Sequence, residues 1–147
     1  MAPALSQEIV IGVVGAGAMG AGIAQVAAQA GHRVLLADAQ TGAVERAVAA
    51  MSKGLQALAG RGKVTAEDAH AVPARIQSAE LMDFAACGLV IEAVVEDLGV
   101  KRALLAQLEG IVSPGCILAT NTSSLSVTAI AAGLKNTGRV IGMHFFN

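Results

Sequence analysis

Three glycines in the pattern Gly-x-Gly-x-x-Gly lie between a short apolar run and an alanine-rich segment, at Gly15, Gly17 and Gly20. The run, residues 8–14, is rich in β-branched side chains, which favours a buried strand. Residues 18–30 carry apolar side chains at helical spacing and predict a helix. A glycine turn in this position is typical of folds built from strand–helix–strand units, so it restricts the choice of fold more than any other feature of the sequence.

The alternation of apolar runs and helical segments continues along the sequence. We expect further strands at 33–37, 75–78, 88–95, 117–120 and 139–144, and further helices at 42–58, from Thr65 to Pro73, at 100–111 and at 126–134. This alternation predicts one α/β domain over residues 1–147, with a Rossmann-type doubly wound, mostly parallel sheet and helices on both faces. Six strands divided into two βαβαβ halves favour the strand order 3-2-1-4-5-6.

The composition excludes several classes of partner. Ten basic and eleven acidic residues leave a formal net charge of -1, whereas nucleic acids and anionic membranes attract a concentrated positive field. No apolar stretch reaches the roughly 18 residues of a membrane span, and residues 1–8 do not have the pattern of a secretory signal. Cys87 and Cys116 have no metal-ligand spacing. We expect buried free thiols, no metal site and a cytoplasmic protein.

Each glycine of the turn has its own physical reason. Gly15 allows the tight turn, Gly17 lets the backbone approach a pyrophosphate, and Gly20 lets the helix pack closely on the strand. Free N–H groups and a partial positive charge at the start of the helix would face the phosphates. Met19 is expected to flank the same pyrophosphate. The turn is therefore a candidate dinucleotide site.

An acidic residue completes the dinucleotide pattern. Asp38 follows Gly20 by 18 residues and comes directly after the second expected strand. A carboxylate there can accept hydrogen bonds from both hydroxyls of an adenosine ribose, and it would repel a 2′-phosphate. Ala39 and Gln40 follow, without an arginine. The sequence therefore favours NAD over NADP, with a helix cap or a solvated loop acid as the alternative interpretation of Asp38.

Ligands of this fold bind where parallel strands end at a common edge of the sheet. The expected strands bring five chemically distinct residues to that edge: Gly15, Asp38, Glu96, Asn121 and His144. Glu92 lies inside a strongly apolar run, so we expect it either to be paired or to reach the active-site edge, because unpaired burial of a charge is unfavourable, and we interpret it as structural.

Four strings of the sequence carry a family resemblance: GAGAMGAGIAQ, LVIEAVVED, ATNTSSLSV and GMHFFN, in this order. Over essentially its whole length the sequence resembles the N-terminal domain of 3-hydroxyacyl-CoA dehydrogenases, including the 3-hydroxybutyryl-CoA enzymes and the dehydrogenase part of multifunctional β-oxidation proteins. The last two strings are more specific than the glycine turn, which many dehydrogenases share. The resemblance implies NAD-dependent oxidation of an L-3-hydroxyacyl-CoA to the 3-ketoacyl-CoA.

The resemblance also implies cofactor contacts outside the glycine turn. It places Val94, Val95 and Glu96 around NAD, with Lys101 of the following helix also reaching it and Asn147 beside the nicotinamide. Taken alone, Lys101 is typical of a solvated charge on a helix.

The same resemblance implies the catalytic and substrate-binding groups. His144 corresponds to the catalytic base, Ser123 contacts cofactor and substrate, and Asn121 lies with Ser123 on the substrate side. A histidine suits this step because its ordinary pKa is near neutral pH. Ser123 would hydrogen-bond the substrate oxygen and fix its distance from the nicotinamide. Taken alone, Thr122, Ser123 and Ser124 would cap the next helix.

Members of the family continue past HFFN with a mostly helical domain that supplies further catalytic residues and much of a dimer interface. We therefore expect a truncated chain or a separately encoded domain, which binds NAD with little activity alone and self-associates through the face left by that domain. The alternative is a stand-alone NAD-binding or regulatory module without catalysis. Acyl chain length and pathway stay open between fatty-acid, butanoate and aromatic-acid degradation.

Overall fold

The structure, a computed structural model that describes residues 3–146, is built around a six-stranded sheet. The strands are β1 (Val10–Val14), β2 (Val34–Ala37), β3 (Ile76–Ser78), β4 (Cys87–Glu92), β5 (Ile117–Thr120) and β6 (Val140–Gly142). They pair in parallel in the order β3-β2-β1-β4-β5-β6. The predicted Rossmann-type strand order is therefore confirmed.

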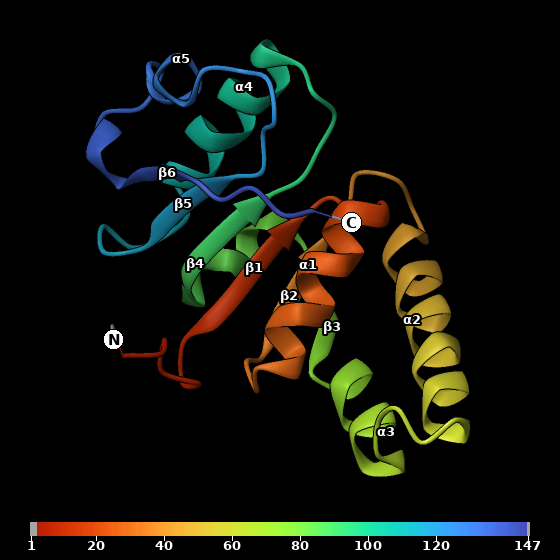
Figure 1. The fold of residues 1–147 in the computed structure, drawn as a ribbon. Coiled ribbons are helices and arrows are strands. Elements are labelled where there is room, and N and C mark those ends of the chain that lie inside the picture. The colour runs from red at the N-terminus through yellow and green to blue at the C-terminus, as the bar shows by residue number, and fades with distance from the viewer. Residues whose placement is uncertain (1–2, 147) are drawn as a thin grey trace.

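Helices cover both faces of the sheet (Figure 1). They are α1 (Ala18–Gln29), α2 (Ala43–Gly60), α3 (Ala66–Ala74), α4 (Leu98–Glu109) and α5 (Val127–Ala131), with 3-10 turns at Leu81–Ala86 and Thr137–Arg139. The first three helices pack on one face, and α4, α5 and the first 3-10 turn pack on the other. Among the described residues, no helix combines the length and the apolarity that a membrane crossing needs.

Strand β2 shows why one short apolar run can support two cores. Val34 and Leu36 are buried in the core beneath α1, α2 and α3, whereas Leu35 and Ala37 are buried in the core beneath α4 and α5. Successive side chains of a strand point to opposite faces, so a strand covered on both sides is apolar throughout. The predicted buried thiols of Cys87 and Cys116 are confirmed, and both lie in the second core.

Two strands, β4 and β6, end earlier than the sequence predicts. The pairing of β4 stops at Glu92, which faces Val14 of β1 and Thr120 of β5. Beyond Val14 the chain turns away at Gly15, so residues 93–97 have no strand to pair with and leave the sheet as a loop. The last strand covers Val140–Gly142 in place of 139–144, because β5 ends at the same level. Both differences place loop residues at the carboxyl edge.

Candidate cofactor and active site

The glycine turn has the shape that its sequence predicts. Gly15 has a φ of 104°, and a Cβ there would lie 2.6 Å from the carbonyl oxygen of Ala93. A Cβ on Gly20 would overlap the carbonyl oxygen of Gly15, so the close packing of α1 on the turn requires glycine. Gly17 differs, because a Cβ there would meet nothing within 4 Å. The space above Gly17 is thus open at the point where a pyrophosphate would approach.

The start of α1 offers donors to this open space. Gly17 is the N-cap residue, and no side chain caps the helix. The first backbone N–H groups of a helix lack partners within the helix and carry a partial positive charge. Such groups bind phosphate oxygens. The turn and the helix start together fit the diphosphate of a dinucleotide.

Asp38 ties the end of β2 to the glycine turn. Its Oδ2 accepts from the backbone N–H of Ala16 at 2.8 Å, and its Oδ1 accepts from that of Gln40 at 2.7 Å. Each carboxylate oxygen has two lone pairs, so both retain capacity to accept from ribose hydroxyls. Asp38 also lines a cavity with Arg46 of α2, which the sequence reasoning missed because it considered only the residues directly after Asp38.

A cavity of about 650 Å³ lies next to Asp38, between the carboxyl ends of the central strands and α4. Val94, Val95 and Leu104 give it apolar walls, and Gly15 and Gly17 lie at its border. A space of this size and polarity fits a flat heterocycle such as adenine. The predicted residues Val94 and Val95 therefore come together with the glycine turn.

A second cavity, of about 370 Å³, lies at the same edge over β5 and β6. Its lining includes six of the predicted site residues: Met19, Val94, Glu96, Asn121, Ser123 and His144. Ala93 and Val94 line both this cavity and the larger one, so the two adjoin. The predicted Asn147 lies outside the described residues.

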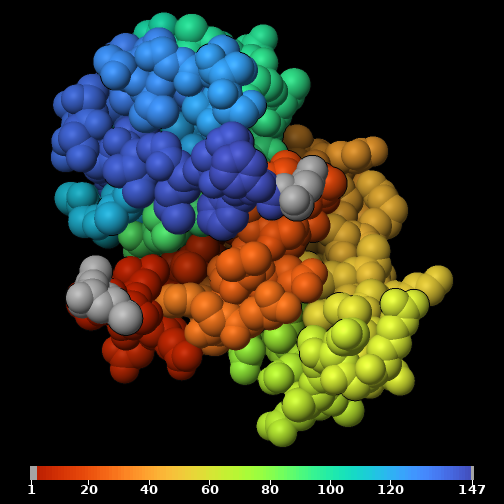
Figure 2. Space-filling model, viewed as in Figure 1, coloured from red at the N-terminus to blue at the C-terminus, as the bar shows by residue number. Residues whose placement is uncertain are grey.

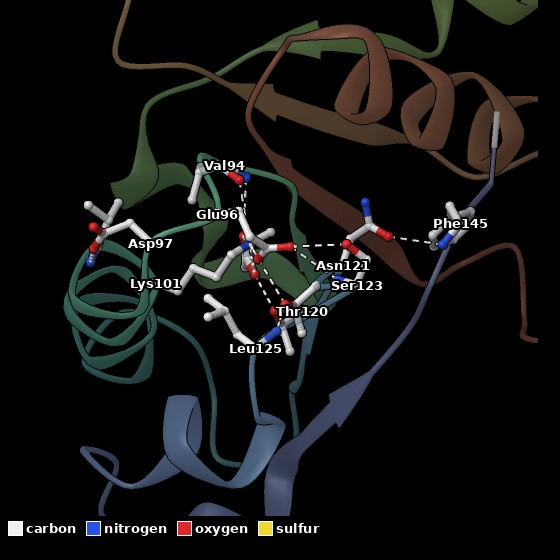
Figure 3. Close-up of polar contacts among 12 residues, drawn as sticks. Val94, Glu96, Asp97, Lys101, Thr120, Asn121, Ser123, Leu125 and Phe145 are labelled. Atoms are coloured by element: carbon white, nitrogen blue, oxygen red, sulfur yellow. Dashed lines mark hydrogen bonds and ion pairs between the residues drawn. The ribbon is translucent and has the colours of Figure 1, made fainter.

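Glu96 organises the loop that carries Ser123 (Figure 3). One carboxylate oxygen accepts from the hydroxyl of Thr122 at 2.8 Å, and the other accepts from the backbone N–H and the hydroxyl of Ser123 at 3.1 and 3.3 Å. Partial burial tends to raise the pKa of Glu96, but these hydrogen bonds and the charge of Lys101 outweigh it and hold the pKa below its usual value. The carboxylate is therefore ionised at neutral pH and fixes Ser123.

The hydroxyls after β5 do not cap the next helix. Thr122 accepts from the N–H of Leu125 within its own loop, while Ser126 accepts from the N–H of Ala129 and caps α5. The alternative interpretation of the hydroxyl cluster as a helix cap is therefore wrong. Thr122 and Ser123 therefore lie at the carboxyl edge of the sheet without a role in capping α5.

A buried ion pair lies directly beneath these loops. The ammonium of Lys101 is 2.8 Å from both carboxylate oxygens of Glu92, and the two side chains are 1% and 0% exposed. Glu92 also accepts from the hydroxyl of Thr120 and, at 3.1 Å, from the N–H of Val94. Glu92 is therefore paired, as predicted from its position in an apolar strand.

The structure decides one of the two interpretations of Lys101. Lys101 is not a solvated helix charge, since it is enclosed between Glu92, the carbonyl of Val94 at 3.4 Å and Glu96 at 3.5 Å. It lines neither of the two cavities, although its ammonium contacts Val94 and Glu96, which do. The expectation that Lys101 reaches a cofactor stays a prediction.

His144 follows β6 and lies at the rim of the second cavity. Its ring centroid is 4.3 Å from that of Phe146, at a tilt of 45°. The segment after β6 extends across the edge of the sheet to the start of α1 (Figure 2), where Phe145 and Phe146 line a groove with Met19. His144 and Ser123 are thereby brought to one place, although 21 residues separate them in the sequence.

The sequence matches a known family and known proteins. The model of the 3-hydroxyacyl-CoA dehydrogenase, NAD binding domain, matches residues 10–147. The 3-hydroxyadipyl-CoA dehydrogenase of Escherichia coli strain K12 is 49% identical over 138 residues, which are 93% of this chain and 29% of that protein. A probable 3-hydroxybutyryl-CoA dehydrogenase of Deinococcus radiodurans is 45% identical over 137 residues, 92% of this chain and 49% of that protein.

Solved structures agree with these matches. The 3-hydroxybutyryl-CoA dehydrogenase from Escherichia coli K12 superposes with a TM-score of 0.92 at 48% identity, over 97% of this chain and 30% of that one. The (S)-3-hydroxybutyryl-CoA dehydrogenase from Ralstonia eutropha gives a TM-score of 0.91 at 41% identity, over 97% of this chain and 50% of that one. The chain spans half or less of the length of each of these relatives.

Proposed function

The chain belongs to the family of 3-hydroxyacyl-CoA dehydrogenase NAD-binding domains, and on that premise we propose that it holds NAD for the oxidation of an L-3-hydroxyacyl-CoA. The family supplies the cofactor, because its domain is an NAD-binding domain. The relatives named above act on 3-hydroxyadipyl-CoA or 3-hydroxybutyryl-CoA. A CoA ester of a 3-hydroxy acid is therefore the substrate class that we assign to the whole protein.

One observation carries this proposal: two adjoining cavities share Ala93 and Val94, one beside Asp38 and the glycine turn, the other beside Ser123 and His144. A dinucleotide is an elongated ligand with a nucleoside at each end. Asp38 would accept from the adenosine ribose, and the first turn of α1 would bind the pyrophosphate. The nicotinamide end would then lie toward Ser123 and His144.

The residues of the second cavity suit oxidation of an alcohol. The chemistry supplied by bound NAD is acceptance of a hydride from the alcohol carbon. His144 would remove the hydroxyl proton as general base and return it in the reverse direction. Ser123, held by Glu96, would hydrogen-bond the same oxygen and keep the reacting carbon in place.

The proposal makes separate predictions for NAD binding and for oxidation of 3-hydroxyacyl-CoA. We expect the chain to bind NAD and to oxidise 3-hydroxyacyl-CoA only slowly by itself, because the matched region is less than half of each of these relatives. Addition of a separately expressed C-terminal portion of a relative should raise the rate. Tight NAD binding without any turnover in the mixture would favour a regulatory module, and full-length rates from the chain alone would contradict the expectation.

The test is a titration of the Gly17→Ala variant with NADH. The new methyl group meets no protein atom within 4 Å, so the fold should be kept. It would occupy the space where the pyrophosphate approaches, so we expect NADH affinity to fall roughly tenfold or more, about 1.4 kcal/mol. Gly54→Ala is the matched control, since its methyl group also meets nothing, on a helix away from the cavities. Equal NADH affinity in Gly17→Ala and the unmodified chain would contradict the proposed site.

A further inference from the structure

We propose that Asn121 is a positioning residue for His144, which it holds at the edge of the sheet by accepting a hydrogen bond from the backbone N–H of Phe145. This inference rests on the proposed function, in which His144 is the base. It assigns the side-chain oxygen of Asn121 to the protein's own backbone, whereas the sequence had suggested a contact with the substrate.

The segment that carries His144 follows a short edge strand and is only partly buried, with Met143 and Phe145 packed against the core beneath α1, α2 and α3. Strand β6 is three residues long and lies at the edge of the sheet, where β5 is its one neighbour among the described residues. Its register ends at Gly142, opposite Thr120. Ile141 is 42% exposed and Gly142 is also exposed, whereas Val140 is partly buried against the core beneath α4 and α5, so apolar burial holds this strand mainly through one side chain.

Two hydrogen bonds continue past the end of the strand, one on each side of His144. The N–H of Met143 donates to the carbonyl of Thr120 at 3.0 Å. The N–H of Phe145 donates to Oδ1 of Asn121 at 2.9 Å (Figure 3). The backbone on both sides of the base is therefore attached to consecutive residues of β5 and its loop. The second attachment depends on a side chain, which a substitution can remove.

Asn121 is itself anchored at a rigid point. Its own N–H donates to the carbonyl of Glu92 at 3.0 Å. The preceding residue, Thr120, is buried, and its hydroxyl donates to the carboxylate of Glu92. The buried pair of Glu92 and Lys101 thus fixes the start of the loop from which Asn121 reaches across to Phe145. The side chain of Asn121 therefore connects this buried pair to the segment that carries His144.

The chemistry of an amide suits this position. Its oxygen is a neutral acceptor, so it binds the backbone N–H without placing a charge beside His144. The nearby carboxylate of Glu96 already accepts from Thr122 and Ser123. Ser123 and His144 are therefore held separately. Glu96, in the loop after β4, binds Ser123, and Asn121, in the loop after β5, binds the segment that carries His144.

The test compares Asn121→Leu, which removes the acceptor at similar volume, with Asn121→Asp, which keeps it. Amide hydrogen exchange of Phe145 and the imidazole NMR signals of His144 are followed in the chain as it exists. We expect exchange at Phe145 to become roughly tenfold or more faster in Asn121→Leu, with altered His144 signals, and to stay slow in Asn121→Asp.

Asn136→Leu is the matched control, since it removes a bond of the same kind, from Oδ1 to the N–H of Gly138 upstream of β6. It should leave Phe145 and His144 unchanged. If Asn121→Leu does not fold, Asn121→Ala replaces it in the same comparison. Unchanged exchange at Phe145 and unchanged His144 signals on loss of the acceptor would overturn the inference. Absence of NADH binding to the unmodified chain would instead overturn the proposed function and leave the Phe145 result valid.

Discussion

Buried charge is the main feature of this molecule at the scale of single residues. Glu92 of β4 and Lys101 of α4 are almost fully enclosed between the sheet and the helix, yet every charged atom has a partner. Removing a charge from water is unfavourable, so such a pair adds little net stability by itself. Its contacts with Val94 and Glu96 connect it to both cavities, which gives the pair a function in holding loops.

Loss of one partner should be far more disruptive than loss of an ordinary surface charge. Lys101→Met would leave the carboxylate of Glu92 buried without a counter-ion, and we expect the free energy of unfolding to fall by about 3–5 kcal/mol. Arg102→Met, on the exposed side of the same helix, should change it by less than about 0.5 kcal/mol. Urea denaturation of both variants measures the difference. Similar midpoints for the two would contradict the role assigned to the pair.

Discrimination between NAD and NADP also depends on single residues. Asp38→Ser removes the negative charge that would repel a 2′-phosphate, while the guanidinium of Arg46 still lines the same cavity. We expect the ratio of NADP affinity to NAD affinity to rise roughly tenfold or more. The double variant Asp38→Ser with Arg46→Ala should lose most of this gain. Titration with both reduced cofactors checks the prediction, and an unchanged ratio would exclude Asp38 as the determinant.

At the scale of elements, the turn between β1 and α1 is the most constrained part of the fold. Gly20→Ala would push a methyl group into the carbonyl of Gly15, and we expect a loss of about 1–3 kcal/mol in the free energy of unfolding. Gly22→Ala, two residues further along the same helix, meets nothing within 4 Å and should stabilise the protein by up to about 1 kcal/mol. Thermal unfolding of both variants shows whether steric packing or helix propensity determines the change in stability at each position. Equal shifts would contradict the close contact.

The strands and helices also show which features of the fold could be predicted from the sequence. The strand order and the glycine turn could be predicted, because both follow from local pattern and spacing. The ends of β4 and β6 could not, since they depend on where Val14 and Thr120 end in neighbouring strands. The turn of Lys101 toward Glu92 likewise depends on how α4 packs on β4.

The candidate site likewise contains residues that the sequence could predict and contacts that it could not. Asp38, Ser123 and His144 lie in motifs, so their presence at the edge of the sheet could be predicted. The hydrogen bond from Phe145 to Asn121 joins residues 24 positions apart, and no spacing rule predicts it. Arg46 was missed for the same reason, because it reaches the cavity of Asp38 from the following helix. Tertiary contacts therefore supply the partners of residues that motifs identify.

At the scale of the whole molecule, one edge of the sheet collects every group that the proposed function uses. The loops after β1 and β2 border the larger cavity, and the loops after β5 and β6 border the smaller one. The loop after β4 lies between them and contributes Ala93 and Val94 to both. This arrangement follows from the parallel order of the strands, since all of them end on the same side.

The most direct test of the central claim is a crystal structure of this chain with NAD. We expect the pyrophosphate at the first turn of α1, the adenosine ribose on Asp38, and the nicotinamide in the cavity that Ser123 and His144 line. NAD bound away from this edge, or bound in the opposite direction with its adenine beside His144, would contradict the account.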